Sequence, residues 1–259
     1  MSGMTGEIVR ESTASPHIAR VVLRHPGKLN AISVAMWRQL RALFVQLQAE
    51  AVIDAPRAVI VCGADGHFAA GADIAEFPEF RFAPDTLRDY HENVIAPALQ
   101  AVLDCDIPLI AQIEGACVGG GLEIAACCDL RIAARDVRLG VPIARLGFPM
   151  APGELAVVRR VVSDALLREL LLEARLLDAE AALARGLLHR VADDAPAEAW
   201  ATAERIAALA SQAARLNKRS LRALAAGGLS EHERAAHFGY ADTAEHRQGI
   251  AAFLHSRSS

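Results

Sequence analysis

The sequence predicts an α/β fold with a helical C-terminal region, because strand-like and helix-like patterns separate along the chain. Short apolar runs that suit buried strands all fall within the first 141 residues, at 18–23, 58–62, 109–113, 129–133 and 138–141. From Glu154 onward, Ala, Leu, Arg and Glu dominate and recur at helical spacing. We therefore expect an α/β core over 1–195 and a helical region over 196–259.

Helices are expected between these strands. Ser33 is a typical N-cap for a helix that runs through Ala49, with apolar side chains at helical spacing. A second helix is expected over 86–103 with an interruption near Pro97, because proline removes a backbone N–H and kinks helices. A short apolar segment over 122–128 suits a buried helix. The C-terminal helices are too apolar to stand alone in water, so we expect them to pack on the core, on a neighbouring subunit, or on both.

The composition is typical of a globular protein with a large core. Hydrophobic residues make up 53% of the chain and charged residues 22%, which argues against disorder. The net charge of -4 gives no support for nucleic acid as the main partner. No apolar run approaches the ~18 residues that span a bilayer, and residues 1–15 lack the apolar segment of a signal peptide. We expect a cytoplasmic protein without membrane association.

The five cysteines lie in apolar surroundings, and their number is odd, so reduced core thiols are expected. They are Cys62, Cys105, Cys117, Cys127 and Cys128. The adjacent pair Cys127 and Cys128 has no second pair at zinc-ligand spacing, so no metal site is expected.

Two glycine-rich turns carry the strongest functional signal. One covers 67–73 and the other 114–123, and each follows a strand-like run and precedes residues that can start a helix. Such turns expose backbone N–H groups without helix partners, where the helix dipole favours negative charge. Two converging turns of this kind would form an oxyanion hole. The glycine run at 119–121 lacks both the spacing of a dinucleotide fingerprint and the Gly-Lys-Ser/Thr of a phosphate loop.

The combination of these motifs resembles the crotonase family, which comprises the enoyl-CoA hydratases and isomerases. The resembling segments cover nearly the whole chain and lie at 28–32, 68–74, 113–133, 184–191 and 247–253. The resemblance implies a crotonase-like spiral of β-β-α units with a helical C-terminal trimerisation region, assembled as a homotrimer or a hexamer. It also implies an acyl-CoA thioester substrate of the kind met in fatty acid metabolism. Coenzyme A is then part of the substrate, and no separate cofactor is expected.

The resemblance also assigns the centre of the site. Its oxyanion donors would be the backbone N–H groups of Ala72 and Gly120, which stabilise an enolate at the thioester oxygen. Glu123, in the first turn of the helix opened by the glycine run, would be the catalytic acid and base, and desolvation by its apolar neighbours would raise its pKa. The alternatives are that Gly120 is a packing glycine and that Glu123 is a helix-start carboxylate interacting with the dipole.

Substrate-binding residues are expected around this centre and at the C-terminus. They are Lys28, Ala70, Asp73, Ile74, Gly119, Ile143, Phe253 and Arg257. Many family members place a lysine just after the terminal aromatic residue, where it meets the nucleotide phosphate. Ser256 stands at that position here, and the adjoining Arg257 either replaces the lysine or is simply solvated. Asp73 is also expected to hold its own turn, and His67 to lie on the turn surface.

The second carboxylate of the family's hydratases is missing. In those enzymes a glutamate follows the proline of the segment that reads Leu139–Ile143 here, and Ile143 occupies its position. Glu154 could reach back into the site, but its position predicts an exposed carboxylate at the start of a helix. One carboxylate suffices to shift a double bond, since one base can remove a proton from one carbon and return it to another.

We therefore expect an enzyme of the enoyl-CoA hydratase/isomerase type, a lyase or an isomerase, with Glu123 as its single acid and base. One alternative is an acyl-CoA hydrolase or decarboxylase that uses the same oxyanion hole. Another, motivated by Ile143, is an acyl-CoA-binding homologue without catalysis. A serine hydrolase is disfavoured because the sequence contains no Gly-x-Ser-x-Gly elbow.

Overall fold

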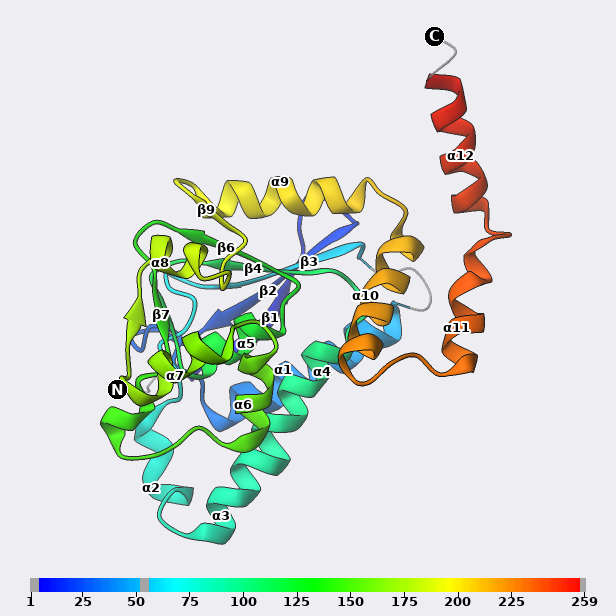
Figure 1. Cartoon of the computed structure of the whole chain (residues 1–259). Helices are drawn as coiled ribbons and strands as arrows, with labels where there is room; N and C mark the ends of the chain where they lie inside the picture. The colour runs from blue at the N-terminus through cyan, green and yellow to red at the C-terminus, as the bar shows by residue number, and fades with distance from the viewer. Residues whose placement is uncertain (1–4, 52–55, 257–259) are drawn as a thin grey trace.

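A six-stranded, mostly parallel sheet forms the centre of the protein (Figure 1). The computed structural model describes residues 5–51 and 56–256, and the sheet has the order β1-β2-β3-β4-β6-β9. These strands are β1 (Glu7–Glu11), β2 (Ile18–Arg24), β3 (Ala58–Gly63), β4 (Leu109–Ile113), β6 (Leu130–Ala134) and β9 (Arg190–Ala192). Only the pairing of β1 with β2 is antiparallel in this sheet. The fold is thus α/β, as the sequence predicts.

A second, smaller sheet lies beside the first. In it, β5 (Ala116–Val118) pairs in parallel with β7 (Arg138–Gly140), and β7 pairs antiparallel with β8 (Leu176–Leu177). All five predicted strands are confirmed to within one residue at each end. The sequence does not predict β1, β5, β8 or β9, because they are short or carry charged residues at their ends, and β8 and β9 lie where helical patterns dominate.

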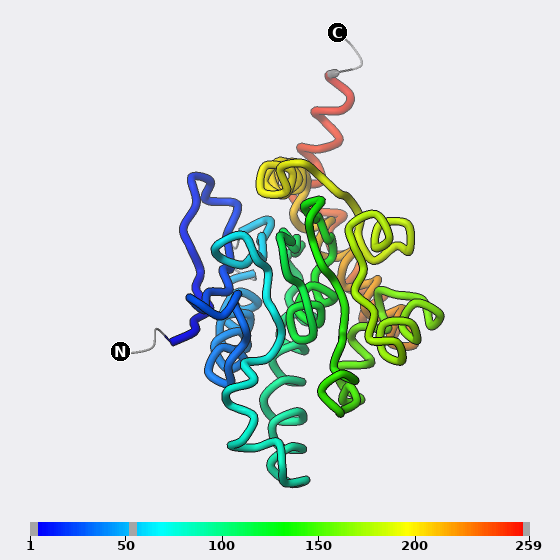
Figure 2. The backbone as a smooth tube through the Cα atoms, turned by 90° about the vertical axis from the view of Figure 1, so that its left-hand side faces the viewer, coloured from blue at the N-terminus to red at the C-terminus, as the bar shows by residue number. Residues whose placement is uncertain are grey.

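Helices cover both faces of the large sheet, because its strands are apolar on both sides. The helices are α1 (Val34–Glu50), α2 (Phe77–Phe80), α3 (Pro84–Asp89), α4 (Ala96–Asp104), α5 (Gly120–Cys127), α6 (Pro152–Arg159), α7 (Asp164–Leu172), α8 (Ala179–Ala184), α9 (Ala195–Ala207), α10 (Ser211–Ala225), α11 (Glu231–His237) and α12 (Ala244–Ser256). Val59 and Val61 pack in the cluster that includes α1, α4 and α5, whereas Ala58 and Ile60 pack against α9 (Figures 1 and 2). Ser33 caps α1 by accepting from the N–H of Met36 at 3.2 Å, as predicted.

The helix predicted over 86–103 is interrupted, and the interruption has a physical cause. The segment consists of α3, a π-helical turn over Tyr90–Ile95, and α4, with Pro97 at the start of α4. Proline supplies no N–H to the preceding turn, so the regular hydrogen-bond ladder breaks there. The wider turn directs Tyr90 and His91 into a cavity described below.

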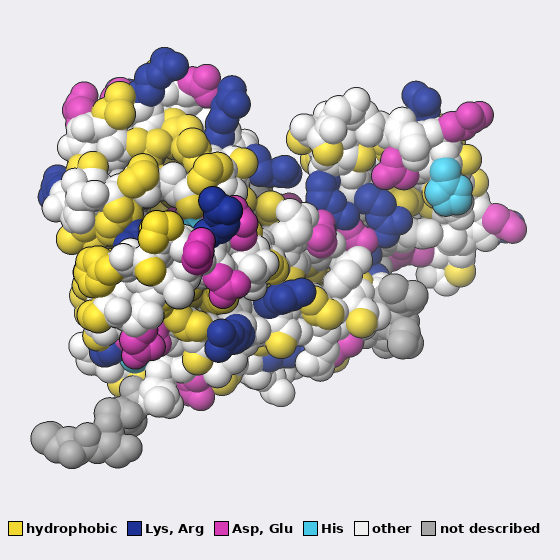
Figure 3. All heavy atoms as spheres, turned by 90° about the horizontal axis from the view of Figure 1, so that it is seen from below, with side chains coloured by type: hydrophobic (Ala, Val, Ile, Leu, Met, Phe, Trp, Pro, Cys, Tyr) yellow, Lys and Arg dark blue, Asp and Glu magenta, His cyan; other side chains and the backbone are white. Residues whose placement is uncertain are grey.

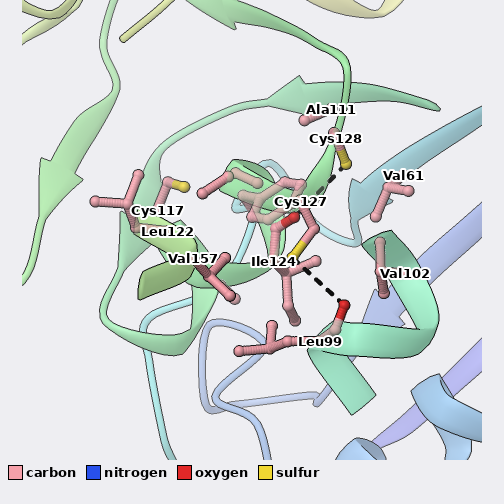
Figure 4. Close-up of a cluster of buried hydrophobic side chains, with 14 of the residues drawn as sticks. Val61, Leu99, Val102, Ala111, Cys117, Leu122, Ile124, Cys127, Cys128 and Val157 are labelled. Atoms are coloured by element: carbon pink, nitrogen blue, oxygen red, sulfur yellow. Dashed lines mark hydrogen bonds between the residues drawn. The ribbon is translucent and has the colours of Figure 1, made fainter. Parts of the chain in front are cut away.

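Helix α5 is buried along its whole length within an apolar cluster (Figure 4). The thiol of Cys127 donates to the carbonyl oxygen of Leu99 at 3.7 Å, and that of Cys128 to the carbonyl oxygen of Ile124 at 3.6 Å. All five cysteines are free and buried, which confirms the prediction of core thiols. This packing fixes the helix that carries Gly120 and Glu123.

The last three helices, α10 to α12, contribute nothing to the core, because none of their described residues is buried. Figures 1 and 3 show α11 and α12 projecting beside the main body. Helix α10 is held to that body by ion pairs. Arg219 and Arg222 contact Asp106 at 2.7 and 2.8 Å, and Lys218 contacts Asp129 at 2.7 Å.

Candidate active site

The two glycine turns meet. The N–H of Ala69 in the first turn donates to the carbonyl oxygen of Ala116 at 2.9 Å, and the N–H of Val118 donates back to Ala69 at 3.0 Å. Further along, a Cβ on Gly119 would lie 3.6 Å from the Cα of Gly71, so the two backbones are in direct contact. The convergence predicted from the sequence is therefore confirmed.

A cavity of about 300 Å³ opens where the turns meet. Of the residues predicted to form the site, it is lined by Ala70, Ala72, Ile74, Gly119, Gly120, Glu123 and Ile143. Further lining comes from three other elements: Trp37 of α1, Tyr90 and His91 of the π-helical turn, and the loop that carries Phe148. Most of this lining is apolar, so the few polar groups in it act in a poorly solvated space.

The backbone N–H of Ala72 is left out of the strand pairing around it. The N–H of Ile32 donates to the carbonyl oxygen of Gly71 at 2.7 Å, and the N–H of Asp73 donates to that of Ile32 at 2.9 Å. Ala72 and Ile32 thus form a parallel β-bridge, in which the neighbours of Ala72, Gly71 and Asp73, make the hydrogen bonds to Ile32. In such pairing the middle residue directs its own N–H to the opposite side of the strand. The geometry leaves this donor available to a group in the cavity.

The N–H of Gly120 is a free helix-terminal donor. Helix α5 begins at Gly120, and its first turn closes when the N–H of Glu123 donates to the carbonyl oxygen of Gly119 at 3.0 Å. The N–H groups that precede this bond have no partner within the helix and lie at the positive end of its dipole. Gly120 is also a packing glycine, since a Cβ there would come within 2.9 Å of Cζ2 of Trp37. The two interpretations of Gly120 are compatible.

Glu123 is an acid kept out of bulk water. Its residue is 6% exposed, and it lines the cavity beside Gly120. Burial raises the pKa of Glu123 well above its ordinary value, and the nearby charge of Glu154 raises it further. A carboxylic acid in this state can give and take protons near neutral pH.

Glu154 is the residue that sequence reasoning placed wrongly. It lies in the first turn of α6, as predicted, but it is only 4% exposed and lines the same cavity as Glu123. Its Oε1 hydrogen-bonds with Nδ1 of His91 at 2.7 Å. The bond joins positions 63 residues apart, so no local pattern in the sequence predicts it. The cavity therefore holds a second carboxylate although Ile143 replaces the expected one.

Tyr90 and Trp37 add two polar groups to an otherwise apolar wall. Burial raises the pKa of the Tyr90 hydroxyl, which stays protonated, and its ring stacks on Phe80 with centroids 4.0 Å apart. Nε1 of Trp37 is buried and lies near the Tyr90 hydroxyl, but within the described part of the chain it makes no hydrogen bond of regular geometry.

Three of the remaining predicted site residues, Lys28, Asp73 and Phe253, are not part of the cavity lining. Lys28 forms an ion pair with Asp73 at 2.6 Å, and Asp73 also accepts from the N–H of Ala75 at 3.3 Å, so Asp73 holds its own turn as predicted. His67 accepts from the N–H of Ala116 at 3.1 Å and so ties the two turns together. Phe253 lies on α12 and is 60% exposed. Arg257 lies outside the described residues.

Neither a metal cluster nor a membrane-spanning helix is found in the residues that the structure describes. No group of three or more His, Cys, Asp or Glu side chains there is arranged to hold a metal ion. Over 5–51 and 56–256, no helix is long and apolar enough to cross a bilayer.

Comparison with known proteins places these features in one family. The enoyl-CoA hydratase/isomerase family model matches residues 13–259. A probable enoyl-CoA hydratase of Mycobacterium tuberculosis is 33% identical over 244 residues, which cover 92% of this chain and 91% of that protein. The human mitochondrial Delta(3,5)-Delta(2,4)-dienoyl-CoA isomerase is 30% identical over 197 residues, covering 73% of this chain and 59% of that one.

Solved structures show the same fold. The crystal structure of an enoyl-CoA hydratase/carnithine racemase from Magnetospirillum magneticum has 40% sequence identity and a TM-score of 0.89, and the match covers 97% of this chain and 92% of that one. An enoyl-CoA hydratase from Bacillus anthracis has 27% identity and a TM-score of 0.85, covering 96% of both chains. These neighbours bear out the crotonase-like architecture expected from the sequence.

Proposed function

Because the chain belongs to the enoyl-CoA hydratase/isomerase family, we propose that it catalyses double-bond chemistry on the acyl group of a CoA thioester. The observation that carries the proposal is the placement of Glu123. A buried acid with a raised pKa lines the same cavity as the two backbone donors of Ala72 and Gly120.

The two donors would bind the thioester oxygen. Removing a proton beside a thioester moves negative charge onto that oxygen, which then accepts from both N–H groups. Each such donor typically lowers the barrier by about 3–4 kcal/mol. Backbone donors suit this role because they are held rigidly and do not titrate.

Glu123 alone accounts for isomerisation. Its carboxylate takes a proton from the carbon next to the thioester of a 3-enoyl substrate, and the electron pair moves onto the thioester oxygen. The resulting acid returns the proton to the far carbon of the former double bond as the enolate collapses to the conjugated product. No water is consumed, and Glu123 ends as the carboxylate that began the cycle.

Hydration needs a second group, and Glu154 is placed to supply it. Water must lose a proton as it attacks the third carbon of a 2-enoyl thioester, while the second carbon gains one. Two carboxyl groups that repel each other's negative charge readily share one proton, so one serves as base and the other as acid. The bond from His91 to Glu154 orients this second carboxylate. We propose that Glu154 performs the proton transfer for which the family's hydratases use a glutamate at the position of Ile143.

Turnover assays on matched 3-enoyl-CoA and 2-enoyl-CoA substrates test these roles. Glu123→Gln is expected to lower both isomerisation and hydration by about 10²–10⁴-fold while acyl-CoA binding persists. Glu154→Gln is expected to lower hydration far more than isomerisation. Glu92→Gln, at an exposed carboxylate of the same π-helical turn as His91, is the matched control and should leave both rates unchanged.

Three outcomes would contradict the proposal. Wild-type rates in Glu123→Gln would show that Glu123 takes no part in catalysis. Tight acyl-CoA binding without turnover of any thioester would identify a binding protein. Release of a free acid or of carbon dioxide from an acyl-CoA panel, detected by mass spectrometry, would identify a hydrolase or a decarboxylase.

We also propose that the chain assembles as a homotrimer or as a hexamer. The support is the character of α10–α12, whose described residues are unburied and include exposed apolar side chains such as Leu221, Phe238 and Ile250. Sedimentation equilibrium should give three or six times the mass of one chain. A monomer at micromolar concentration would refute this assembly.

A further inference from the structure

An arginine is held in the cavity wall by two aromatic rings. Arg81 follows α2, and its guanidinium carbon lies 3.5 Å from the ring centroid of Phe148 and 4.4 Å from that of Phe77. All three residues line the cavity that holds Glu123. Stacking on a ring covers the flat face of a guanidinium and leaves the N–H groups at its edge available.

Arg81 forms no ion pair within the described residues, although the charge of Glu154 acts on it, whereas Glu154 and Arg145 of the same wall are bonded to other residues. Among the described residues, no carboxylate comes within ion-pairing distance of its guanidinium. Glu154 is bonded to His91, and the guanidinium of Arg145 donates to the carbonyl oxygen of Ala174 at 2.8 Å. Burial lowers the pKa of Arg81, but the group remains charged at any physiological pH.

Two polar groups of the same wall lie beside each other. Nε1 of Trp37 is buried and lies near the hydroxyl of Tyr90, and both residues line the cavity with Arg81. A cavity built for a plain hydrocarbon chain has no use for a cation without an ion-pair partner, whereas an acyl group with an anionic end would satisfy it.

We propose that Arg81 is an anion-binding residue of the acyl cavity, and that the preferred substrates are CoA thioesters whose acyl chain carries a second carboxylate. The inference rests on the proposed function, because that function places the acyl group beside Glu123. The edge of a planar guanidinium can donate two parallel hydrogen bonds to one carboxylate. The phosphates of CoA are a poorer match, since the pantetheine arm separates them from the thioester that would lie beside Glu123.

Paired substrates test the inference. Mono-CoA thioesters of trans-2-enedioic acids with five to eight carbons are compared with neutral isosteres in which an isopropyl group replaces the free carboxylate. The wild-type protein should turn over at least one carboxylate substrate with a kcat/KM about 100-fold above that of its isostere. Arg81→Gln should abolish this preference while changing kcat/KM for the isosteres by less than about 3-fold. Arg81→Lys keeps the charge but loses the planar pair of N–H donors, so its preference for the carboxylate substrate should lie between those of the wild type and Arg81→Gln.

Binding measurements separate this inference from the proposed function. Calorimetry with the saturated mono-CoA thioester of a dicarboxylic acid, its neutral isostere and CoA alone needs no turnover. Arg81→Gln should weaken only the first of the three, and Arg88→Gln, at an exposed arginine of α3, should weaken none. Equal weakening of all three would assign Arg81 to a CoA phosphate, and a wild-type preference for the neutral isosteres would also overturn the inference. Absence of turnover on every thioester, with the binding preference intact, would refute the proposed function alone.

Discussion

The two glycine turns that meet at the cavity are held in shape by opposite means. The first depends on a side chain: Nδ2 of Asn30 donates to the carbonyl oxygens of Ala64 and His67, each at 2.8 Å, and its Oδ1 accepts from the N–H of His25 at 3.0 Å. Asn30 is buried, so these backbone groups have little access to water. At its start, the first turn is therefore held by the side chain of one buried amide.

The second turn depends on the lack of side chains. Gly119 has a φ of 53°, a conformation that most residues adopt at a cost. A Cβ on Gly121 would lie 2.6 Å from the carbonyl oxygen of Ala69, and one on Gly115 would lie 2.4 Å from Nδ1 of His67. The comparison predicts that the first turn is disturbed when a side chain is removed and the second when a side chain is added.

The largest stability effect is expected from adding a methyl group to the second turn. Gly121→Ala forces a contact with backbone rather than with a flexible side chain, so about 3 kcal/mol of unfolding free energy should be lost in urea denaturation. Gly249→Ala, in α12 with no atom within 4 Å of the added Cβ, is the control and should be neutral or slightly stabilising. Equal stability of the two variants would show that the turns are not in close contact.

Removing the amide from the first turn should cost about 2 kcal/mol and lower turnover. Asn30→Ala leaves the carbonyl oxygens of Ala64 and His67 without their donor. Asn30 also has a φ of 58°, so Asn30→Gly separates the hydrogen bonds from the backbone conformation. If Asn30→Gly matches the wild type in urea denaturation and in turnover, the hydrogen bonds do not hold the turn. Asn93→Ala, which loses an exposed hydrogen bond, is the control.

A smaller effect is expected in the pH dependence of stability, through Glu123 in the helix that follows the second turn. Because burial raises the pKa of Glu123, the folded state keeps a proton that the unfolded chain loses above the ordinary pKa of 4.5. The unfolding free energy therefore falls as pH rises from that value through the raised one. Glu123→Gln removes this contribution, so its thermal midpoint should decline less between pH 5 and 9 than that of the wild type. Parallel curves would mean that Glu123 is solvated in the folded protein.

The smallest effect is expected from the ion pair beside the first turn. The Lys28 side chain is 43% exposed, so its pair with Asp73 should contribute less than about 1 kcal/mol. Lys28→Ala should leave stability nearly unchanged and raise KM for acyl-CoA, because the sequence predicts that Lys28 binds the substrate. An unchanged KM would limit Lys28 to its contact with Asp73.

The sequence predicts those features whose signals are local. Five strands follow from apolar runs, the cap at Ser33 from one side chain, and the two turns from their glycines. The burial of Glu154 depends on a bond to His91 that spans 63 positions, and the setting of Arg81 depends on a ring 67 positions away, at Phe148. Neither pairing has a periodicity or a spacing that marks it. The acid that replaces the expected carboxylate and the cation of the cavity are therefore visible only in the folded chain.

The backbone N–H groups of Ala72 and Gly120 are proposed to bind the thioester oxygen together. A crystal structure of Glu123→Gln with an unprocessed 2-enoyl-CoA tests this proposal most directly. The account predicts that the thioester oxygen lies about 2.7–3.1 Å from both backbone nitrogens, with the reacting carbons facing residue 123 and Glu154. A thioester oxygen bound elsewhere, or in contact with only one of the two nitrogens, would contradict it.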